Sequence, residues 1–315
     1  MSRTIPGEDA TRSDRGQPAP RRGPLVAVLH VLAGVAGFGL GLLPWLVTGL
    51  RLPLQNLWAV EVLPEQMPRV LLPFSQYALT LVLGLVVTGA AVVGLLARVR
   101  GERARVALHA GSGWFGAAVL ATAQTAQVVA DGLADDPRAD LYLTALLAVT
   151  AVAVVLGLVV LVLLAVAPPA GAAVGGAFGA LAAGIWLNAL VVPFGSIASD
   201  WQTTLLGGAR WVPAVLVGLV LAWCGLSSVG RVVAWLVDLA LLWVVPAGLT
   251  AVSYATGSRV LLGQPAEAVA AGLQVFGAAL STAGVSWPLV LVALAVGLAG
   301  LLLRRVACFR GRATG

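Results

Sequence analysis

The chain has 315 residues, of which 60% are hydrophobic and only 10% are charged. A typical water-soluble domain is about 25% charged, so this composition, with a mean hydropathy of +0.98, excludes an ordinary aqueous fold. The net charge is +6. We nevertheless expect no nucleic-acid partner, because the basic residues flank apolar segments, where the anionic lipid headgroups of a bilayer account for them.

Eight apolar runs follow one another along the chain, each near the ~20 residues that a helix needs to cross ~30 Å of hydrocarbon. They cover residues 25–50, 74–97, 106–130, 141–167, 171–194, 211–228, 232–255 and 286–303. The sequence therefore predicts an all-α, polytopic integral membrane protein with eight transmembrane helices. We expect a single eight-helix domain over 25–305, between a polar, disordered cytoplasmic tail over 1–24 and a short basic cytoplasmic tail over 306–315.

The arginines predict the orientation of the spans. All 19 basic residues are Arg, and with both termini in the cytoplasm only five of them lie outside: Arg51, Arg69, Arg138, Arg210 and Arg259. Cytoplasmic loops of membrane proteins carry such an excess of positive charge. The complete absence of Lys is typical of a GC-rich genome, so we expect a multi-pass protein of a bacterial cytoplasmic membrane, with both termini and anionic lipid headgroups at the cytoplasmic face.

Two outer segments are too apolar for free loops. The segment 53–73 is rich in apolar residues, interrupted by Pro64 and Pro68, and it either lies along the outer interface or dips back into the bundle. A second segment begins at Pro265 and places Val269, Leu273, Phe276 and Leu280 at helical spacing. This pattern predicts an outer interfacial amphipathic helix; the alternative is one long helix, kinked near Pro288, that includes the eighth span.

The fifth run repeats small residues at every fourth position. Gly171, Gly175, Gly179 and Ala183 form a face that another helix backbone can approach closely. Packing inside one bundle explains this face, and a homo-oligomer seam or a docking surface for a membrane-protein partner is the alternative. The first run has a shorter version in Gly37 and Gly41.

Asp238 is the leading functional candidate, because a charge inside hydrocarbon costs ~2.5–3.5 kcal/mol on insertion scales and needs a partner or water. It lies about 10 Å into the membrane from Arg231, at 1.5 Å per residue. His30 and His109 enter their own spans by similar offsets, so the three side chains could share one layer and relay a proton or gate an entrance. The alternative is that Asp238 bonds a hydroxyl or Arg231 and that each His is a packing residue.

The third run is the most polar of the eight. At 100° per residue, His109, Gln124, Gln127 and Asp131 fall on one side of the helix, which should face the bundle interior. Asn188 of the fifth run lies at a depth similar to that of Gln124 and is its expected partner. The amides would either line a polar pathway or hold helices together.

An acidic loop follows the third run and contains DxxxD spacing twice, in the four residues Asp131, Asp135, Asp136 and Asp140. The spacing resembles the paired diphosphate-and-magnesium motifs of membrane prenyltransferases. Those enzymes have such motifs in two separate places, whereas this chain has them in a single loop. A metal-binding role is therefore one interpretation, and a solvated cap on the helix is the other. We expect no resident metal and no cofactor.

Two functional hypotheses remain. The chain contains neither a nucleotide-binding motif nor a paired-His metal spacing, so we expect that it is not an enzyme. The first hypothesis is a small-solute or proton-linked transporter with a route lined or gated by polar side chains. The second is a non-catalytic membrane scaffold or assembly partner of cell-envelope or division machinery. A water-filled vestibule that reaches Asp238 would favour transport, and a bundle packed solid would favour the scaffold.

Overall fold

The computed structural model describes residues 23–257, 264–281, 284 and 286–313, so most of the predicted tail over 1–24 and Arg259 lie outside the described residues. These residues form helices without a strand. The first half of the chain contains α1 (Pro24–Gly41), α2 (Leu43–Leu46), the 3-10 helix η1 (Pro64–Gln66), α3 (Leu79–Arg98), α4 (Arg103–Gly132) and α5 (Pro137–Val166). The second half contains α6 (Pro169–Val191), α7 (Asp200–Ala209), α8 (Val212–Cys224), α9 (Val229–Gly257), α10 (Pro265–Leu280) and α11 (Ser286–Ala313).

Eight helical segments in this part of the chain are long and apolar enough to cross a membrane, which agrees with the predicted number of runs, although the segment Asp200–Cys224 begins before the predicted run 211–228. Seven are the single helices α1, α3, α4, α5, α6, α9 and α11, and the eighth combines α7 and α8 across a bend at 210–211. In the structure, α11 continues to Ala313, so most of the predicted C-terminal tail over 306–315 is helical. The multi-pass architecture follows from these helices.

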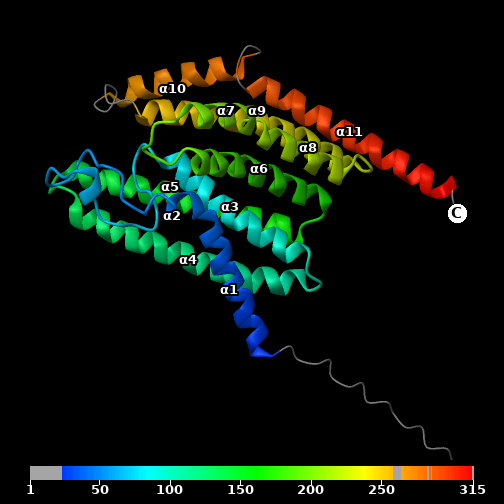
Figure 1. Ribbon diagram of the computed structural model, residues 1–315, viewed down its shortest axis with the longest axis horizontal. Coiled ribbons are helices and arrows are strands. Elements are labelled where there is room, and N and C mark those ends of the chain that lie inside the picture. The colour runs from blue at the N-terminus through cyan, green and yellow to red at the C-terminus, as the bar shows by residue number, and fades with distance from the viewer. Residues whose placement is uncertain (1–22, 258–263, 282–283, 285, 314–315) are drawn as a thin grey trace, which may run out of the picture.

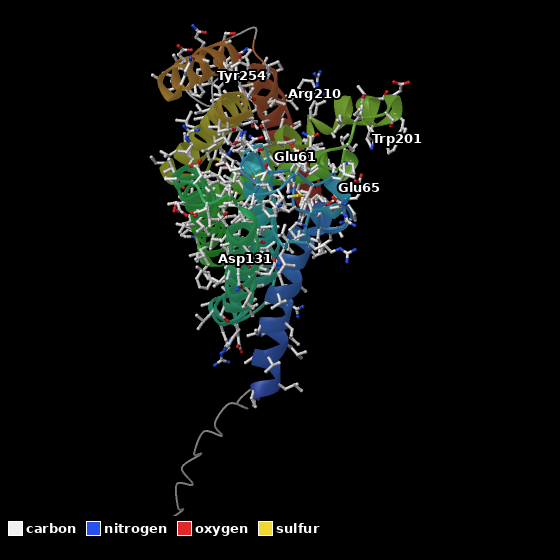
Figure 2. All side chains as sticks on the ribbon, turned by 90° about the vertical axis from the view of Figure 1, so that its left-hand side faces the viewer. Glu61, Glu65, Asp131, Trp201, Arg210 and Tyr254 are labelled. Atoms are coloured by element: carbon white, nitrogen blue, oxygen red, sulfur yellow. The ribbon has the colours of Figure 1, made fainter. Side chains whose placement is uncertain are left out.

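The helices run back and forth between two ends of the bundle. Figure 1 shows the connections α3–α4, α5–α6 and α8–α9 at the same end as the C-terminal part of α11, and we call this the Arg-rich end. Figure 2 looks onto the opposite end, where Glu61, Glu65 and Asp131 are labelled, and we call this the acidic end. Four arginines lie in or beside the α3–α4 connection: Arg98, Arg100, Arg103 and Arg105. The predicted unequal distribution of Arg between the two sides of the spans is therefore present in the folded bundle.

The first span is shorter than its apolar run. Although 25–50 was predicted, α1 ends at Gly41 and the four-residue α2, which contains Pro44, follows. Figure 1 shows α1 crossing α4 obliquely. Glycines permit this crossing: a Cβ on Gly34 would lie 2.8 Å from the backbone nitrogen of Trp114, and one on Gly113 would overlap the carbonyl of Val31.

Two apolar cores lie side by side, and α6 connects them. The larger core contains Trp114, Phe38 and Leu85, which come from α4, α1 and α3. The second contains Leu221 and Leu242, which come from α8 and α9. Helix α6 packs against α3 and α5 on one side and against α8 and α9 on the other, so it occupies the middle of the bundle in Figure 1.

The segment between α2 and α3 dips into the acidic end of the first core. Met67, Val70, Leu72 and Phe74 are at most 1% exposed. Backbone without helical hydrogen bonds is tolerated at such depth only where the protein supplies partners. The structure therefore selects the second of the two predicted placements for 53–73.

Helix α10 begins at Pro265 as predicted, but it does not lie across the spans. Gly272 faces Ala251 and Ala255, Phe276 faces Gly248, and the Trp243 indole donates to Leu280 O (3.1 Å), so α10 runs antiparallel along α9. Half of the predicted apolar stripe, Val269 and Leu273, is exposed, because the small residues of α10 permit the closer contact with α9. Nor is α10 continuous with the eighth span, since it ends at Leu280 and α11 begins at Ser286.

Helix α7 is the outer part of the bent segment that it forms with α8; it lies at the periphery of the acidic end, and the sequence analysis did not predict it. Ser199 and Gln202 form a capping box at its start, and the Gln202 amide also donates to Val191 O (2.6 Å). Trp201 is 65% exposed and lies far out from the bundle in Figure 2. The capping box is a short, local sequence signal, and α7 lacks the long apolar run by which the spans were predicted. The sequence analysis therefore missed α7.

Arg98, at the Arg-rich end, stabilises the fold through contacts with two neighbouring helices. Arg98 donates to Leu164 O (2.5 Å) and Ala167 O (2.6 Å), beyond the last helical bonds of α5. Its guanidinium also lies 5.3 Å from the ring centroid of Trp223 on α8. A cation is stabilising at a helix C-terminus, where carbonyls lack partners and the helix dipole is negative.

Candidate functional site

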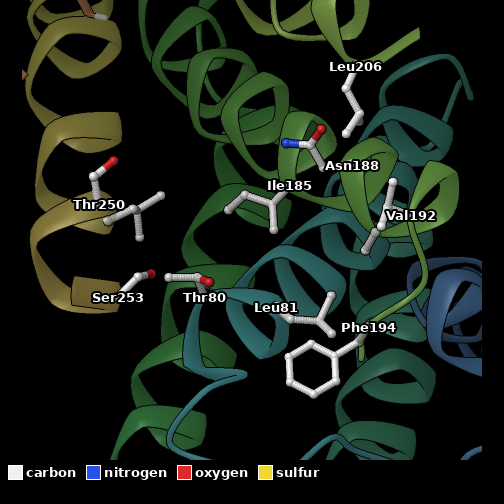
Figure 3. Close-up of a pocket in the computed structure, with 11 residues that line it drawn as sticks. Thr80, Leu81, Ile185, Asn188, Val192, Phe194, Leu206, Thr250 and Ser253 are labelled. Carbon is white, nitrogen blue, oxygen red and sulfur yellow. The ribbon is translucent and has the colours of Figure 1, made fainter. Parts of the chain in front are cut away.

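A groove opens at the acidic end between the two halves of the bundle. It has a volume of about 530 Å³ and is lined by the start of α3, the end of α6, the outer part of α9 and one residue of α7 (Figure 3). The lining residues are Thr80, Leu81, Ile185, Asn188, Ala189, Val192, Phe194, Leu206, Leu249, Thr250 and Ser253. The groove exists because α3 and α9 make little contact directly and are joined mainly through α6.

Three polar side chains of the groove have no hydrogen-bond partner among the described residues: Thr80, Asn188 and Ser253. Figure 3 shows the Ser253 hydroxyl on the side of Thr80, with the Thr80 hydroxyl turned the other way, and the Asn188 amide directed into the space between the helices. The fourth, Thr250, donates to Pro246 O (2.8 Å) within its own helix. The groove thus presents free hydrogen-bonding groups and no ionisable side chain.

One hydrogen bond spans the two halves beside this groove. Gln76, which precedes α3, donates through Nε2 to Thr256 O at the end of α9 (3.2 Å). Thr256 lies three residues, less than one helical turn, beyond the groove residue Ser253. The bond therefore holds the outer ends of α3 and α9 together, where a separation of the halves would widen the groove.

Asp238 lies deep in the second half and is 0% exposed. Neither carboxylate oxygen has a hydrogen-bond partner among the described residues, so the predicted alternatives, a hydroxyl or Arg231, do not hold it. One turn away on either side of it along α9 are the buried residues Ala234 and Leu242. Ala234 belongs to a small cluster with Cys224 and Ala173, and Leu242 to the second core, so Asp238 lies between two apolar clusters.

The two histidines come together, but they are not with Asp238. Their ring centroids are 6.3 Å apart, at the crossing of α1 and α4, and the His109 Nδ1 lies 2.9 Å from Arg105 O. The packing partners of α9 are chiefly α6, α8, α10 and α11. A relay that needs contact between Asp238 and a histidine is therefore not formed in this structure, because equal depth along the spans does not place helices next to each other.

The polar side of α4 is divided between structural and exposed positions. The Gln124 oxygen accepts from Leu71 N (3.0 Å) and its amide donates to Arg69 O (3.2 Å), while Thr125 Oγ1 accepts from Leu72 N (3.0 Å). Asn188 is therefore not the partner of Gln124. Gln127 is exposed, so the predicted continuous polar stripe does not face the bundle interior.

Other side chains complete the attachment of the dipping segment. Gln55 donates to Phe74 O (2.8 Å) and accepts from the Tyr142 hydroxyl (2.6 Å), and the Trp45 indole donates to Val70 O (3.0 Å). The Gln124 amide belongs to this set, so the structure uses it as a support for non-helical backbone.

The small residues of α6 pack inside the bundle. A Cβ on Gly175 would lie 2.9 Å from Leu163 Cβ of α5, and one on Gly179 would lie 3.1 Å from Ala91 Cβ of α3. Gly171 lies beside the same end of α5, next to Ala167. Ala183, the last member of the predicted row, is partly buried.

The acidic loop does not form a metal-binding cluster. In the part of the chain that the structure describes, no three His, Cys, Asp or Glu side chains are close enough together to hold a metal ion. Asp136 is the N-cap of α5 and accepts from Arg138 N (2.7 Å). Asp131, Asp135 and Asp140 lie at the ends of α4 and α5 around it, at the acidic end.

Thr80, Thr250 and Ser253 are groove residues that the sequence analysis missed. Hydroxyl side chains are common in transmembrane helices, where they bond to their own backbone, so each one alone carries little signal. Thr250 and Ser253 are three residues apart and share a helix face, which was the only available pattern.

Comparison of the chain with protein-family models, curated proteins and solved structures finds no match. The function proposed below therefore rests on the geometry of the groove and of Asp238.

Proposed function

We propose that this multi-pass protein is a proton-linked transporter of a small solute in a bacterial cytoplasmic membrane, with both termini in the cytoplasm and anionic lipids around the Arg-rich end. The single observation that carries the proposal is the unpaired carboxyl of Asp238. A buried carboxylate without a partner costs several kcal/mol or more, so the packed bundle requires a proton or a cation on it.

The groove supplies the second part of the proposal. Asn188 was a predicted pathway residue, and it lies with Thr80 and Ser253 in a groove that is open at the acidic end. At the Arg-rich end, Arg98 of α3 contacts both α5 and Trp223 of α8, and Arg304 of α11 donates to Ala222 O of α8 (2.7 Å), so side-chain contacts hold the helices together there. This combination fits the outward-facing state of an alternating-access mechanism.

Helix α9 offers a physical link between the groove and Asp238. Leu249 and Ser253 lie on one side of Pro246, and Asp238 lies eight residues before it on the other side. Pro246 lacks an N–H, so the helical hydrogen bond to Leu242 O is missing and the helix bends most easily there. A change in the packing around Asp238 would therefore tilt the part of α9 that lines the groove.

Proton flux into proteoliposomes, read with a pH-sensitive dye inside, tests the proposal. We expect Asp238→Asn to reduce the flux to that of empty liposomes, because the amide has the same shape and takes up no proton. Asp200→Asn is the matched control, since Asp200 is an exposed acid at the start of α7. Unchanged flux in a folded Asp238→Asn protein would refute the proposal.

One observation favours the second candidate, a non-catalytic scaffold. Asp238 is fully buried in a packed bundle and does not line the groove. Under this hypothesis the wild-type protein conducts no protons, and an exposed peripheral element such as α7 serves as the docking surface. Wild-type flux equal to that of empty liposomes would favour it over transport.

A further inference from the structure

We propose that the groove at the acidic end binds an uncharged amphipathic molecule that carries hydroxyl groups, drawn from the outer half of the bilayer. This inference deepens the proposed function, since it names the chemical class of the transported molecule. It rests on the side chains that line the groove and on the level of the groove along the spans.

The lining selects against charge. None of its eleven residues is Asp, Glu, Lys, Arg or His. A charged ligand group would lose water on entering and would gain no partner of opposite sign, which makes its transfer costly. The groove is therefore built for a neutral ligand.

The free polar groups match hydroxyls best. Asn188 offers two N–H donors and a carbonyl acceptor, and Thr80 and Ser253 each offer one donor and an acceptor. Carboxylates only accept and ammonium groups only donate, so either would leave part of this set unsatisfied. A ligand hydroxyl donates and accepts at once, as these three side chains require.

The remaining wall is apolar. Ile185 and Leu206 lie on either side of Asn188 in Figure 3, and Phe194 lies beside Leu81. All four apolar side chains would contact a hydrocarbon chain. The volume of about 530 Å³ lies within the ~300–1,000 Å³ of small-molecule sites. Polar groups on one side and apolar groups on the other fit an amphiphile with a small head.

The position of the groove indicates where the ligand comes from. Asn188 is three residues before the end of α6, and Thr80 is the second residue of α3, so the polar groups lie near the acidic ends of their spans. This is the depth at which the neutral head of an amphiphile meets its chain. Leu206 of the peripheral helix α7 covers the groove from outside, and Leu205 beside it is 49% exposed.

Photolabelling of the full-length protein in nanodiscs tests the inference. The probe is octyl glucoside with a diazirine in its alkyl chain, used below its micelle concentration, and labelled peptides are identified by mass spectrometry. We expect labelling to concentrate in 79–84, 185–194 and 249–253. An excess of unlabelled octyl glucoside should reduce it at least fivefold, whereas octyltrimethylammonium, octyl sulfate and free glucose should not.

A pair of double variants tests the role of the hydroxyls. Thr80→Val with Ser253→Ala removes two free hydroxyls of the groove with little change in shape, and we expect at least a fivefold loss of labelling. The matched control is Thr204→Val with Ser281→Ala, which removes hydroxyls that bond to their own backbone outside the groove and should label like the wild type. Asn188→Leu should reduce labelling about tenfold.

Three results would overturn the inference. These are labelling spread evenly over the lipid-facing helices, equal competition by the charged amphiphiles, and undiminished labelling in the groove variants. Competition by free glucose as strong as that by octyl glucoside would overturn the lipid origin and assign the site to a soluble sugar.

The Asp238→Asn protein separates this inference from the proposed function. Groove labelling needs no proton flux, so labelling retained with flux lost supports both. Labelling retained with normal flux supports the binding site and refutes the proton-linked mechanism. Flux that depends on Asp238 in a wild-type protein without groove labelling refutes the binding site alone.

Discussion

Two regions of the bundle use polar side chains inside apolar spans in opposite ways. In the first half, Gln124 and Thr125 are hydrogen-bonded to the backbone of the segment that dips between α2 and α3. In the second half, Asp238 is fully buried with both oxygens unpaired, and Asn188 opens onto a groove without a partner. The same kind of sequence signal, a polar residue in an apolar run, thus has a structural cause beside the dipping segment and none at Asp238 or in the groove.

This difference suggests a criterion that distinguishes polar side chains with a structural role from polar side chains with a functional role. A polar group that satisfies nearby backbone is explained by the fold, because unsatisfied backbone in a bilayer is costly. A buried polar group without a partner costs stability, and it is retained only if something else requires it. The following predictions break or sharpen this comparison.

The largest effect is expected from Gly113→Val in the first half. A Cβ at this position would overlap the Val31 carbonyl and lie 3.1 Å from Val31 Cα, so α1 must move away from α4. Overpacking alone costs about 1–3 kcal/mol, and separation of the helix pair adds to it, so we expect a loss of about 3 kcal/mol or more. Thermal unfolding in detergent measures it.

Gly116→Val is the matched control on the same helix. A Cβ on Gly116 meets nothing within 4 Å, and valine forms helix slightly better than glycine. Its melting temperature should equal or exceed that of the wild type. If both variants unfold early, the close crossing of α1 and α4 does not explain the effect.

Gln124→Leu should destabilise the protein by about 2–4 kcal/mol, because Leu71 N and Arg69 O each lose a partner at about 1–3 kcal/mol. The loss is local to the dipping segment, so its amides should exchange faster in hydrogen–deuterium exchange. Gln127→Leu, on the same helix and exposed, should change neither quantity. A transport defect in Gln124→Leu without loss of stability would contradict the structural role.

The change in stability should have the opposite sign for Asp238→Leu. We expect this variant to be more stable by about 1–3 kcal/mol, since it removes a buried carboxyl group that forms no hydrogen bond. Each kcal/mol raises the melting temperature of a chain of this size by about 2–4 °C or somewhat less. Asp238→Asn keeps the shape and an unpaired polar group and should stay close to the wild type. A destabilised Asp238→Leu protein would mean that the carboxyl has a partner. Asp238 would then resemble Gln124, and the difference between the two regions would disappear.

The sequence predicted the spans because their signal is local to each helix. Length and hydropathy identify a membrane helix without knowledge of its neighbours. The start of α10 at Pro265 was also readable, since proline is favoured at the first helical position. The end of α1 at Gly41 was not, because a membrane-spanning length of apolar residues continued through Pro44.

The site depended on contacts between helices, which one sequence does not specify. Asp238 and Asn188 were identified by type, but the expected partners were wrong, since depth along a span fixes only one of three coordinates. His30 and His109 were placed together correctly, yet α9, which carries Asp238, packs elsewhere. The groove was not predictable, because Thr80 and Ser253 line it only after α3 and α9 face each other across α6.

The smallest effect is expected from Arg304→Ala. This variant tests a polar side chain of the second half that, unlike Asp238, has hydrogen-bond partners. Arg304 donates through Nη1 to Ala222 O (2.7 Å) and Trp223 O (3.0 Å), at the last turn of α8. A cation at a helix C-terminus contributes about 0.3–1 kcal/mol when partly exposed, so we expect a loss of about 1 kcal/mol in thermal unfolding at low salt.

Arg305→Ala provides the comparison, because Arg305 is the next residue of α11, is exposed and forms no hydrogen bond among the described residues. The dipole contribution is screened by salt, so the gap between the two variants should narrow at 1 M salt. Equal losses would mean that charge alone matters at this end. A larger loss for Arg304 would mean that its hydrogen bonds to Ala222 O and Trp223 O, and not its charge alone, stabilise the last turn of α8.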